Sequence, residues 1–508
     1  MNRTFTATIG LQLHKKYDII KIYKKGMVIL MKMLIGGQKR DSIDGKVINI
    51  FNPANGELID TVPDSSTKDL DLLLEHSLKG KKFWGGTPLH ERSKILLNFI
   101  DKLSLHIDEL AELLCRETGK NIKEAKLEVG LVPVIFRRFL EGANHMYGIT
   151  LPDSQPGGER DLIFTRREPL GTILCIIPFN FPASTYAYKV APALATGNSV
   201  IVKPPSDNPL TLIRMSELLT ECGVPGDALQ IVTGSGSVVG KYLVGSPHID
   251  AVSLTGSTEV GVETAKQAAS NLHRVFLELG GNDAMIVYED GDINLAVQEA
   301  IMARTTNCGQ ICIATKRFIV QNSIKDEFTK KLVDKLNSLK IGDPMDPSCD
   351  MGCLINEAAA LKIKEQVEHT LKQGAKCVLG GNIINKAFFE PTVLADVDAS
   401  MDIAKDMEVF GPVFPVIGFD TLEEAVGIHN ASVYGLNGGI ITRDTSKAMK
   451  TAYQLECGTV VLNGNGRYRH PDIAFGGYKM SGIGREGVSS TLEELTQVKT
   501  IVMKGILG

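Results

Sequence analysis

Hydrophobic and polar positions repeat along this chain with two different periods, and each period predicts a type of element. A short stretch, KVINIFNP at 46–53, predicts a β-strand. Apolar positions that recur every three or four residues then predict helices at 67–85, 89–118 and 121–147. From 172 to 279, short apolar runs alternate with helical patterns. This alternation predicts a parallel sheet with helices on both faces.

A second alternation of strands and helices runs from 284 to 463, so the sequence predicts two α/β lobes in series. Residues 161–169 and 497–506 fit neither lobe, because both are extended, amphipathic and rich in β-forming residues. Strands without a home sheet often pair across chains. We therefore expect these two segments to form an oligomerisation flange that builds a homodimer or homotetramer.

Composition and charge exclude several classes of protein. A length of 508 residues exceeds what one hydrophobic core usually organises, which agrees with two or three domains. A net charge of −4 indicates no nucleic-acid partner and no anionic membrane surface. No apolar run approaches the ~20 residues that a membrane helix requires. The partners that we expect are therefore small molecules and further copies of the chain.

The cysteine count indicates the compartment. Nine cysteines, an odd number without a signal peptide, predict reduced thiols in a cytoplasmic protein. Their spacings are wider than those of zinc sites and no histidine cluster accompanies them, so we expect no metal. The basic first 30 residues would suit a presequence. The sequence from Met31 already reads as a natural start, however, so we expect residues 1–32 to be a poorly ordered extension.

One cysteine differs from the others in its surroundings. Cys312 lies in ARTTNCGQICIATKRF (303–318), just after a Gly-Gln pair at a break between apolar runs. Free cysteines are usually buried and inert, but backbone amides at such a break can favour a thiolate. The sequence therefore predicts that Cys312 is a nucleophile, with Cys308 as the alternative.

Glu278 lies in the otherwise apolar run FLELGG (276–281). Burial of an unpaired carboxylate raises its pKa toward the range of a useful general base. The structural alternative is a salt bridge with Arg274, which strand alternation puts on the same face. Gly280 and Gly281 permit close approach of a cofactor ring or a loop.

Asn180 lies between Pro178 and Pro182 in IIPFNFP, which holds its carboxamide rigidly. A donor aimed at a developing oxyanion contributes roughly 3–4 kcal/mol in the well-studied hydrolases. A thiol, a carboxylate and a carboxamide suffice to oxidise an aldehyde through a thioester. In that reaction Cys312 attacks, Asn180 holds the oxyanion and Glu278 activates water.

The nucleotide site is predicted less directly, because no GxGxxG follows a first strand. Of two glycine-rich turns, TGSGSVVG (233–240) and TGSTEVG (255–261), the second is the better candidate. It puts Ser257 at a helix N-terminus, where free N–H groups and the helix dipole favour a phosphate. Lys203, at the end of strand SVIVK, would reach a ribose or would be an exposed strand-end lysine. Glu408 in MEVFGPV would bind ribose hydroxyls.

These motifs together resemble the aldehyde dehydrogenase superfamily. PFNFP, LTGST, FLELGG, GQIC, EVFGPV and FGGYKMSGIGREG occur in the family's order, and the match runs from about Leu34 to Lys504. The resemblance implies an α/β fold with a Rossmann-like cofactor domain, an α/β catalytic domain and a β-strand flange. We place the cofactor domain at 33–147 and 170–280, the catalytic domain at 281–480, and the bridging segments at 148–169 and 481–508.

The resemblance also implies oxidation of an aldehyde to the carboxylic acid with NAD or NADP, using Cys312, Glu278 and Asn180. The expected cofactor contacts are Ile177, Pro178, Phe179, Lys203, Ser206, Gly236, Gly256, Ser257, Leu279, Gly280, Glu408 and Phe410. Two alternatives remain. Relatives that pass the acyl group to coenzyme A generally lack the glutamate, and non-catalytic relatives would have lost the thiol or the base.

Departures from the family pattern bear on the cofactor. NAD-preferring members tend to carry a glutamate three residues after the strand-end lysine, where this chain has Ser206. A small neutral residue does not repel a 2′-phosphate, and Lys203 would pair with that phosphate. The sequence therefore predicts that NADP is accepted or preferred.

Other departures bear on the substrate. Members that oxidise succinate semialdehyde carry arginines at the places of Tyr188 and Thr306. The loop NGNGRYRHPDIAFGG (463–477) is more similar to that of relatives that oxidise lactaldehyde, benzaldehyde or glyceraldehyde 3-phosphate. Arg469, and also Arg138, are candidates to meet a polar or anionic substrate tail. Both are equally compatible with a surface or interface position.

Overall fold

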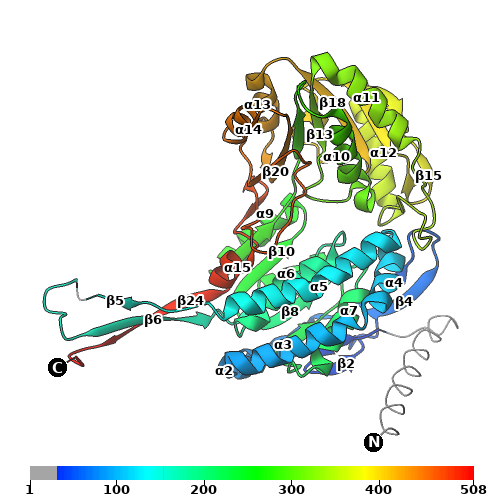
Figure 1. Cartoon of the computed structure of the whole chain (residues 1–508). Helices are drawn as coiled ribbons and strands as arrows, with labels where there is room; N and C mark the ends of the chain where they lie inside the picture. Colours follow the sequence, from blue (N-terminus) through cyan, green and yellow to red (C-terminus); the bar gives the residue numbers. More distant parts are fainter. Residues whose placement is uncertain (1–30, 153, 508) are drawn as a thin grey trace, which may run out of the picture.

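The computed structural model describes residues 31–152 and 154–507. They form two lobes, and a long β arm projects from the lower one (Figure 1). The predicted N-terminal extension, residues 1–32, lies outside the described residues except for its last two. No helix in this part of the chain is long and apolar enough to cross a membrane.

The first lobe is built on an eight-stranded sheet. Its strand order is β2 (Gln38–Arg40), β1 (Met33–Ile35), β9 (Leu229–Ile231), β8 (Ser199–Lys203), β7 (Thr172–Ile176), β10 (Ala251–Thr255), β11 (Arg274–Glu278) and β23 (Gly482–Ile483). The five strands from β9 to β11 are parallel, as the strand–helix alternation predicts. The chain order reverses direction between β7 and β10. In open α/β sheets, ligands bind at the carboxyl ends of the strands beside such a point.

Helices cover both faces of this sheet. One face packs against α2 (Thr67–Gly86), the π-helical turn η1 (Gly236–Gly240), α8 (Lys241–Val244) and α9 (Thr258–Ala269). The other packs against α6 (Pro182–Ala195) and α7 (Leu210–Glu221), with α3 (Leu89–Ser104), α4 (Ile107–Thr118) and α5 (Ile122–Ala143) beyond them. The predicted helix at 89–118 is wrong in one respect, because the chain turns at Leu105, where the apolar side chain is exposed.

The second lobe repeats this plan with a seven-stranded sheet. Its strand order is β14 (Lys376–Leu379), β17 (Thr392–Val397), β18 (Val413–Phe419), β13 (Arg317–Gln321), β12 (Ala284–Val287), β20 (Asn437–Ile441) and β21 (Thr459–Leu462). All neighbours are parallel except β14 and β17. One face of this sheet packs against α10 (Ile293–Thr305) and α11 (Asn322–Leu336). The other face packs against α12 (Glu357–Lys372), α13 (Leu422–Asn430) and α14 (Thr445–Ala452).

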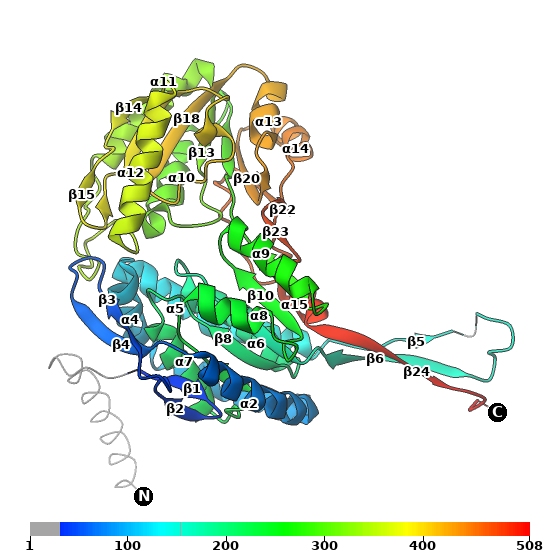
Figure 2. The same ribbon diagram turned by 180° about the vertical axis from the view of Figure 1, so that it is seen from behind.

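The arm is a three-stranded sheet in the order β24 (Thr496–Met503), β6 (Leu162–Pro169) and β5 (Thr150–Leu151). The two segments that fit neither lobe pair with each other within the chain, from Thr496 opposite Pro169 to Met503 opposite Leu162. Figure 2 shows the arm standing clear of both lobes. α15 (Val488–Glu494) leads from the first lobe into it.

Short elements complete the chain. They are the hairpin β3 (Val47–Phe51) and β4 (Leu58–Pro63), the pairs β15 (Ile383–Asn385) with β16 (Phe388–Phe389) and β19 (Tyr434–Gly435) with β22 (Tyr478–Lys479), and the 3₁₀ turns η2 (Thr306–Gly309) and η3 (Asp402–Ala404). The predicted α/β class with two lobes and a β-strand flange is confirmed.

Candidate active site

The predicted cofactor residues of the first lobe all follow the carboxyl ends of its parallel strands. β7 leads into Ile177, Pro178 and Phe179, β8 ends at Lys203, and η1 begins at Gly236 just after β9. β10 leads into Gly256 and Ser257, and β11 into Leu279 and Gly280. Adjacent turns are tied together, because the N–H of Ile177 donates to the Lys203 carbonyl (3.0 Å) and that of Gly256 to the Glu278 carbonyl (3.1 Å). The sheet topology therefore gathers them at one edge.

Two of these turns suit a phosphate group. Ser257 caps α9, accepts from the Val260 N–H (3.4 Å) and is exposed. Gly236 is exposed, and a Cβ added there would meet open space. Backbone N–H groups at both helix starts are thus accessible to an anion.

Lys203 is a buried, nearly unpaired cation at this edge. Its side chain is 5% exposed, so the alternative of a solvated strand-end lysine is wrong. Its Nζ lies 3.4 Å from the Ser206 hydroxyl, which itself donates to the Gly234 carbonyl. Burial lowers the pKa of Lys203 to about 8, although the carboxylate of Asp207 raises it. A cation held in this way gains from a new anionic partner.

The second lobe brings Glu408 and Phe410 into contact with residues of these turns. A carboxylate oxygen of Glu408 accepts from the Gly281 N–H and pairs with Lys316, both at 3.2 Å. The Phe410 ring lies edge-on to Phe179, with centroids 5.9 Å apart. A Cβ at Gly280 would lie 2.6 Å from a carboxylate oxygen of Glu408, so a side chain there would displace this carboxylate.

Cys312 follows a turn with unusual backbone geometry. Asn307, Cys308 and Gly309 are left-handed in succession, with φ of 48°, 54° and 73°. Such geometry costs free energy for residues other than glycine and persists only where the surroundings enforce it. The buried guanidinium of Arg304 enforces it here by donating to the carbonyls of the Gly309 turn and of the loop around Gly411.

The turn separates the two cysteines. Cys308 points into the core of the second lobe and is 2% exposed, and burial raises its pKa well above the usual value. Cys312 is partly exposed and packs against an apolar cluster that includes Phe181 and Phe475. The geometry therefore disfavours Cys308 as the nucleophile.

The thiolate expectation for Cys312 is wrong in this arrangement. Burial raises the pKa of the Cys312 thiol to about 12, even though Lys316 lowers it. The ammonium of Lys316 donates to the Cys312 carbonyl (2.5 Å), so it fixes the backbone rather than contacting the sulfur. Cys312 is a thiol at neutral pH and needs a base.

Asn180 is fixed directly against the turn. Its Nδ2 donates to the Gln310 carbonyl (3.0 Å), which leaves its second N–H unused. Its own carbonyl accepts from Lys120 (2.9 Å) and from the Asn307 side chain (3.0 Å). Lys120 in turn pairs with buried Glu128, and its ammonium lies 3.8 Å above the Phe181 ring. This network positions the carboxamide beside the nucleophile loop.

Glu278 ends β11 with a carboxylate that is 8% exposed, and its Oε2 is buried without a hydrogen-bond partner. Burial and then the neighbouring carboxylate of Glu486 raise its pKa to about 8. The Arg274 alternative is wrong, because that guanidinium donates to the carbonyls of Glu494 and Thr496. A Cβ added at Gly281, three residues after Glu278, would lie 3.1 Å from the Cys312 carbonyl, so the end of this strand lies against the loop that carries Cys312.

A cavity of about 20 Å³ lies beside Glu278. Buried Lys189 and partly buried Glu486 line it, and their charged groups lie 3.6 Å apart. A space of this size holds about one water molecule. The base therefore has polar neighbours through which a proton can leave.

The two arginines named for the substrate differ. The guanidinium of Arg469 pairs with Glu486 and lies between the rings of Tyr188 (4.4 Å) and Phe475 (3.8 Å), with Nη1 buried and unpartnered. Arg138 is half-exposed and pairs with Glu141 and Asp472. The charges of both are thus already matched by carboxylates.

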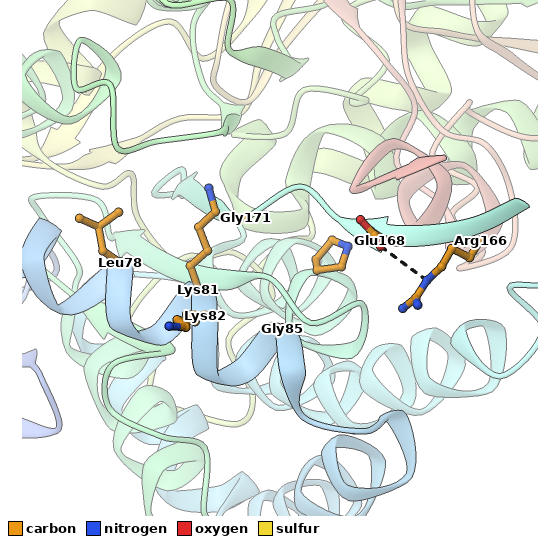
Figure 3. Close-up of a pocket in the computed structure, with 8 residues that line it drawn as sticks. Leu78, Lys81, Lys82, Gly85, Arg166, Glu168 and Gly171 are labelled. Carbon is orange, nitrogen blue, oxygen red and sulfur yellow. Dashed lines mark ion pairs between the residues drawn. The ribbon is translucent and has the colours of Figure 1, made fainter. Parts of the chain in front are cut away.

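A separate surface pocket of about 410 Å³ lies at the base of the arm (Figure 3). It is lined by Leu78, Lys81, Lys82 and Gly85 of α2 and by Arg166, Glu168, Pro169 and Gly171. Its main charges are paired, Lys81 with Asp250 (2.7 Å) and Arg166 with Glu168 (3.5 Å). The predicted site residues do not line it, so we exclude it as the active site.

The fold and the site combine two α/β lobes with a thiol, a carboxamide and a buried carboxylate that lie where the lobes meet. The chain belongs to the aldehyde dehydrogenase family, whose pattern matches residues 39–501. It is an NAD(P)-dependent oxidoreductase that oxidises aldehydes, and this prediction is confirmed.

Three similar proteins illustrate the range of the family. The lactaldehyde dehydrogenase of Methanococcus maripaludis (strain C7) is 35% identical, over 91% of this chain and all of its own. The succinate-semialdehyde dehydrogenase [NADP(+)] of Escherichia coli (strain K12) is 35% identical, over 92% and 96%. The crystal structure of Staphylococcus aureus betaine aldehyde dehydrogenase in complex with NAD+ has a TM-score of 0.92 at 34% identity, over 96% and 97%.

Proposed function

We propose that Cys312 is the nucleophile, Asn180 the oxyanion donor and Glu278 the general base of aldehyde oxidation. The observation that carries this proposal is the convergence of the three on one loop. Asn180 bonds to the carbonyl two residues before Cys312, and the end of the strand that carries Glu278 lies against the Cys312 loop, because a Cβ added at Gly281 would lie 3.1 Å from the Cys312 carbonyl. Each side chain has the chemistry that its role requires.

The raised pKa values of Cys312 and Glu278 support a proton transfer between these two groups. The Cys312 thiol, with a pKa of about 12, gives its proton to Glu278 as the sulfur attacks the carbonyl carbon. The free N–H of Asn180 stabilises the resulting oxyanion. Bound NAD(P)+ supplies the hydride acceptor, and the substrate carbon is left as a thioester on Cys312. Glu278, deprotonated again, then takes a proton from water as that water attacks the thioester.

The cleft fits the nicotinamide cofactor. Gly280 leaves room beside Glu408, the turns at Gly236 and Ser257 offer free N–H groups, and Lys203 has no carboxylate partner within 4.0 Å in the described chain. Lys203 and Ser206 support a preference for NADP, because an unpaired cation beside a small neutral residue suits a 2′-phosphate.

One experiment tests the reaction and its alternatives. The full chain is assayed with short aliphatic, aromatic, hydroxy- and semialdehydes, with NAD and NADP, and with and without coenzyme A. We expect the free acid as the product in every case, because Glu278 is present. An acyl-coenzyme A product would show that the thioester is transferred to coenzyme A instead of being hydrolysed. An absence of cofactor reduction with every aldehyde would favour a non-catalytic protein.

Of the two arginines named for the substrate tail, Arg469 is the better candidate and Arg138 the weaker one. The buried Nη1 of Arg469 is free to donate one hydrogen bond to a polar substrate atom. The charge of Arg469 is taken up by Glu486. Arg138 faces two carboxylates at the surface, so its role stays a prediction without support from its contacts.

We also propose that the arm joins copies of the chain in a homodimer or homotetramer. β24 and β21 are edge strands, and the arm exposes Val498 (57%) and Val502 (50%). Exposed edges with apolar side chains favour pairing between chains. Light scattering of the double variant Val498→Lys and Val502→Lys should show a smaller assembly. The nine free cysteines support a reducing compartment such as the cytoplasm.

A further inference from the structure

Arg467 stands apart from the other guanidinium groups of the site. It lies two residues before Arg469 on the 463–477 loop, yet its contacts are of another kind. Its Nη1 donates to the Met302 carbonyl (2.5 Å) and to the Thr306 hydroxyl (2.8 Å). In the described residues, its Nε and Nη2 have no hydrogen-bond partner, and no carboxylate lies within 4.0 Å. Burial lowers the pKa of Arg467, although the carboxylates of Glu124 and Glu299 raise it.

The loop that carries Arg467 brackets the nucleophile. On one side, Arg467 is bonded to Thr306, six residues before Cys312. On the other, the Thr315 hydroxyl, three residues after Cys312, donates to the Asn465 carbonyl (2.5 Å). Asn465 is also held by both the carboxylate and the carbonyl of Glu299. The cation therefore occupies a fixed place relative to the sulfur, and Cys312 is among the groups that influence its pKa.

The free face of Arg467 has the shape of a carboxylate receptor. Nε and Nη2 lie on the same side of a guanidinium and present two parallel N–H bonds, which match the two oxygens of a carboxylate. The buried arginines of the second lobe lack such a face. Arg304 and Arg317 each donate to several backbone carbonyls, and Arg469 is paired with Glu486.

The surrounding charges favour a monoanion. Glu124 and Glu299 are the carboxylates that act on Arg467, and neither forms a close ion pair with it. A dianionic phosphate would face both carboxylates with one unpaired cation, whereas a carboxylate requires only that cation. Thr306 and Tyr188 are neutral themselves, but a guanidinium from the 463–477 loop reaches each of them.

We propose that Arg467 binds a carboxylate at the far end of the substrate, so that the preferred substrates are semialdehydes, which carry an aldehyde at one end and a carboxylate at the other. This inference rests on the proposed function of Cys312. In this assignment Arg467 recognises the negative charge of the substrate. Glu486 neutralises the charge of Arg469, so Arg469 donates at most one hydrogen bond to the substrate.

The test compares matched substrates on the full-length enzyme. Succinate semialdehyde and glutarate semialdehyde carry the carboxylate, methyl 4-oxobutanoate and pentanal lack it, and glyceraldehyde 3-phosphate carries a phosphate instead. In Arg467→Gln, we expect kcat/KM for the better semialdehyde to fall about ten- to a hundredfold, mainly through KM. For the two neutral aldehydes we expect a change of less than about twofold.

Three further variants separate charge from structure. Arg467→Lys keeps the charge without the fork, so we expect an intermediate loss. Thr306→Val removes one of the two hydrogen bonds that hold the guanidinium but leaves its charge, so we expect a loss on the semialdehydes smaller than that of Arg467→Gln. Arg138→Gln removes a surface arginine with two carboxylate partners, and it should keep the wild-type preference for semialdehydes.

Several outcomes would overturn the assignment. An equal loss on pentanal and the semialdehydes in Arg467→Gln would make Arg467 structural. A wild-type preference for neutral aldehydes would show that Arg467 does not bind a substrate carboxylate. A preference for glyceraldehyde 3-phosphate that disappears only in Arg467→Gln would show that Arg467 binds a phosphate instead. Turnover of pentanal by the wild type confirms that the oxidation itself is intact, so failure of the inference is distinct from failure of the proposed function.

Discussion

The two lobes contribute to the same cleft by different physical means. The first lobe presents Lys203, Ser257 and Glu278 at the carboxyl ends of adjacent parallel strands, so the topology of the sheet alone brings them together. The second lobe presents Cys312 after a left-handed turn, which a buried arginine and contacts to the other lobe hold in place. The cofactor side thus depends on sheet order, and the nucleophile side depends on an enforced, costly backbone.

The largest expected effect separates the two cysteines on either side of that turn. Cys312→Ala removes the group that becomes covalently bonded to the substrate, so we expect steady-state oxidation to fall by about 10⁴-fold or more. Cys308→Ala leaves the backbone turn and the nucleophile in place, so activity should stay near the wild-type level. Cofactor reduction followed at 340 nm measures both.

The reverse result would break the comparison between the two sides of the turn. Retained activity in Cys312→Ala, together with a loss in Cys308→Ala, would move the nucleophile into the core of the second lobe. Mass spectrometry of the protein after reaction with an aldehyde and cofactor locates the acyl group independently.

The next effect concerns the base that the first lobe supplies. Glu278→Gln removes the acceptor for the proton of water, so steady-state turnover should fall by about 10²- to 10⁴-fold. The carboxyl must be deprotonated to act, and its pKa is about 8. The wild-type rate of thioester hydrolysis should therefore rise with pH up to about 8 and then level off.

Stopped-flow measurement separates the two stages of this variant. Glu278→Gln should still release a burst of reduced cofactor, but more slowly than the wild type because the thiol has lost its proton acceptor, and the inflection near pH 8 should be lost. Steady-state turnover at the parental rate with an unchanged pH profile would rule out Glu278 as the base.

A third variant acts on the contact between the lobes. Asn180→Ala removes the donor to the oxyanion and also the bond to the Gln310 carbonyl, so kcat/KM should fall by about 10²- to 10³-fold. Asn180→Asp keeps the volume but puts an acceptor where a donor is required, and it should be at least as damaging. Activity within tenfold of the wild type in both variants would show that other N–H groups hold the oxyanion.

The sequence predicts much of the first lobe for a physical reason. Strand–helix alternation is visible in the hydrophobic pattern, and alternation fixes which turns meet at the edge of the sheet. Lys203, Ser257, Glu278 and Gly280 were found from that rule and from the family's motifs. The helix at 89–118 was not divided correctly, because the turn at Leu105 carries an apolar residue and no glycine or proline.

The second lobe was harder to predict, because its contacts join residues far apart in the chain. Lys120 bonds to the Asn180 carbonyl across 60 positions, and Lys316 and Arg467 lie in stretches where a lysine or an arginine is unremarkable. The left-handed backbone at Asn307 and Cys308 has no sequence signal beyond the following glycine. The expected thiolate at Cys312 was wrong, because burial, which a local sequence does not reveal, outweighs the nearby cation.

The smallest predicted effect tests the cofactor side through pH. Burial holds the pKa of Lys203 at about 8, so the free enzyme loses this charge as the pH rises above 8. A bound 2′-phosphate is a dianion there and favours the protonated amine. The KM for NADP should therefore increase, approaching about tenfold per pH unit well above pH 8, while the KM for NAD changes much less.

Two substitutions show whether this dependence belongs to Lys203. Lys203→Met removes the titrating group, so the KM for NADP should be high and independent of pH between 7 and 9.5. Ser206→Glu leaves the lysine but puts a carboxylate beside the phosphate position, so it should shift the preference toward NAD by about tenfold. Parallel pH profiles for NAD and NADP in the wild type would mean that the 2′-phosphate does not contact Lys203. Any preference for NADP over NAD would then have to come from residues of the second lobe. Binding of the cofactor would in that case depend on contacts between the two lobes, as the position of Cys312 does.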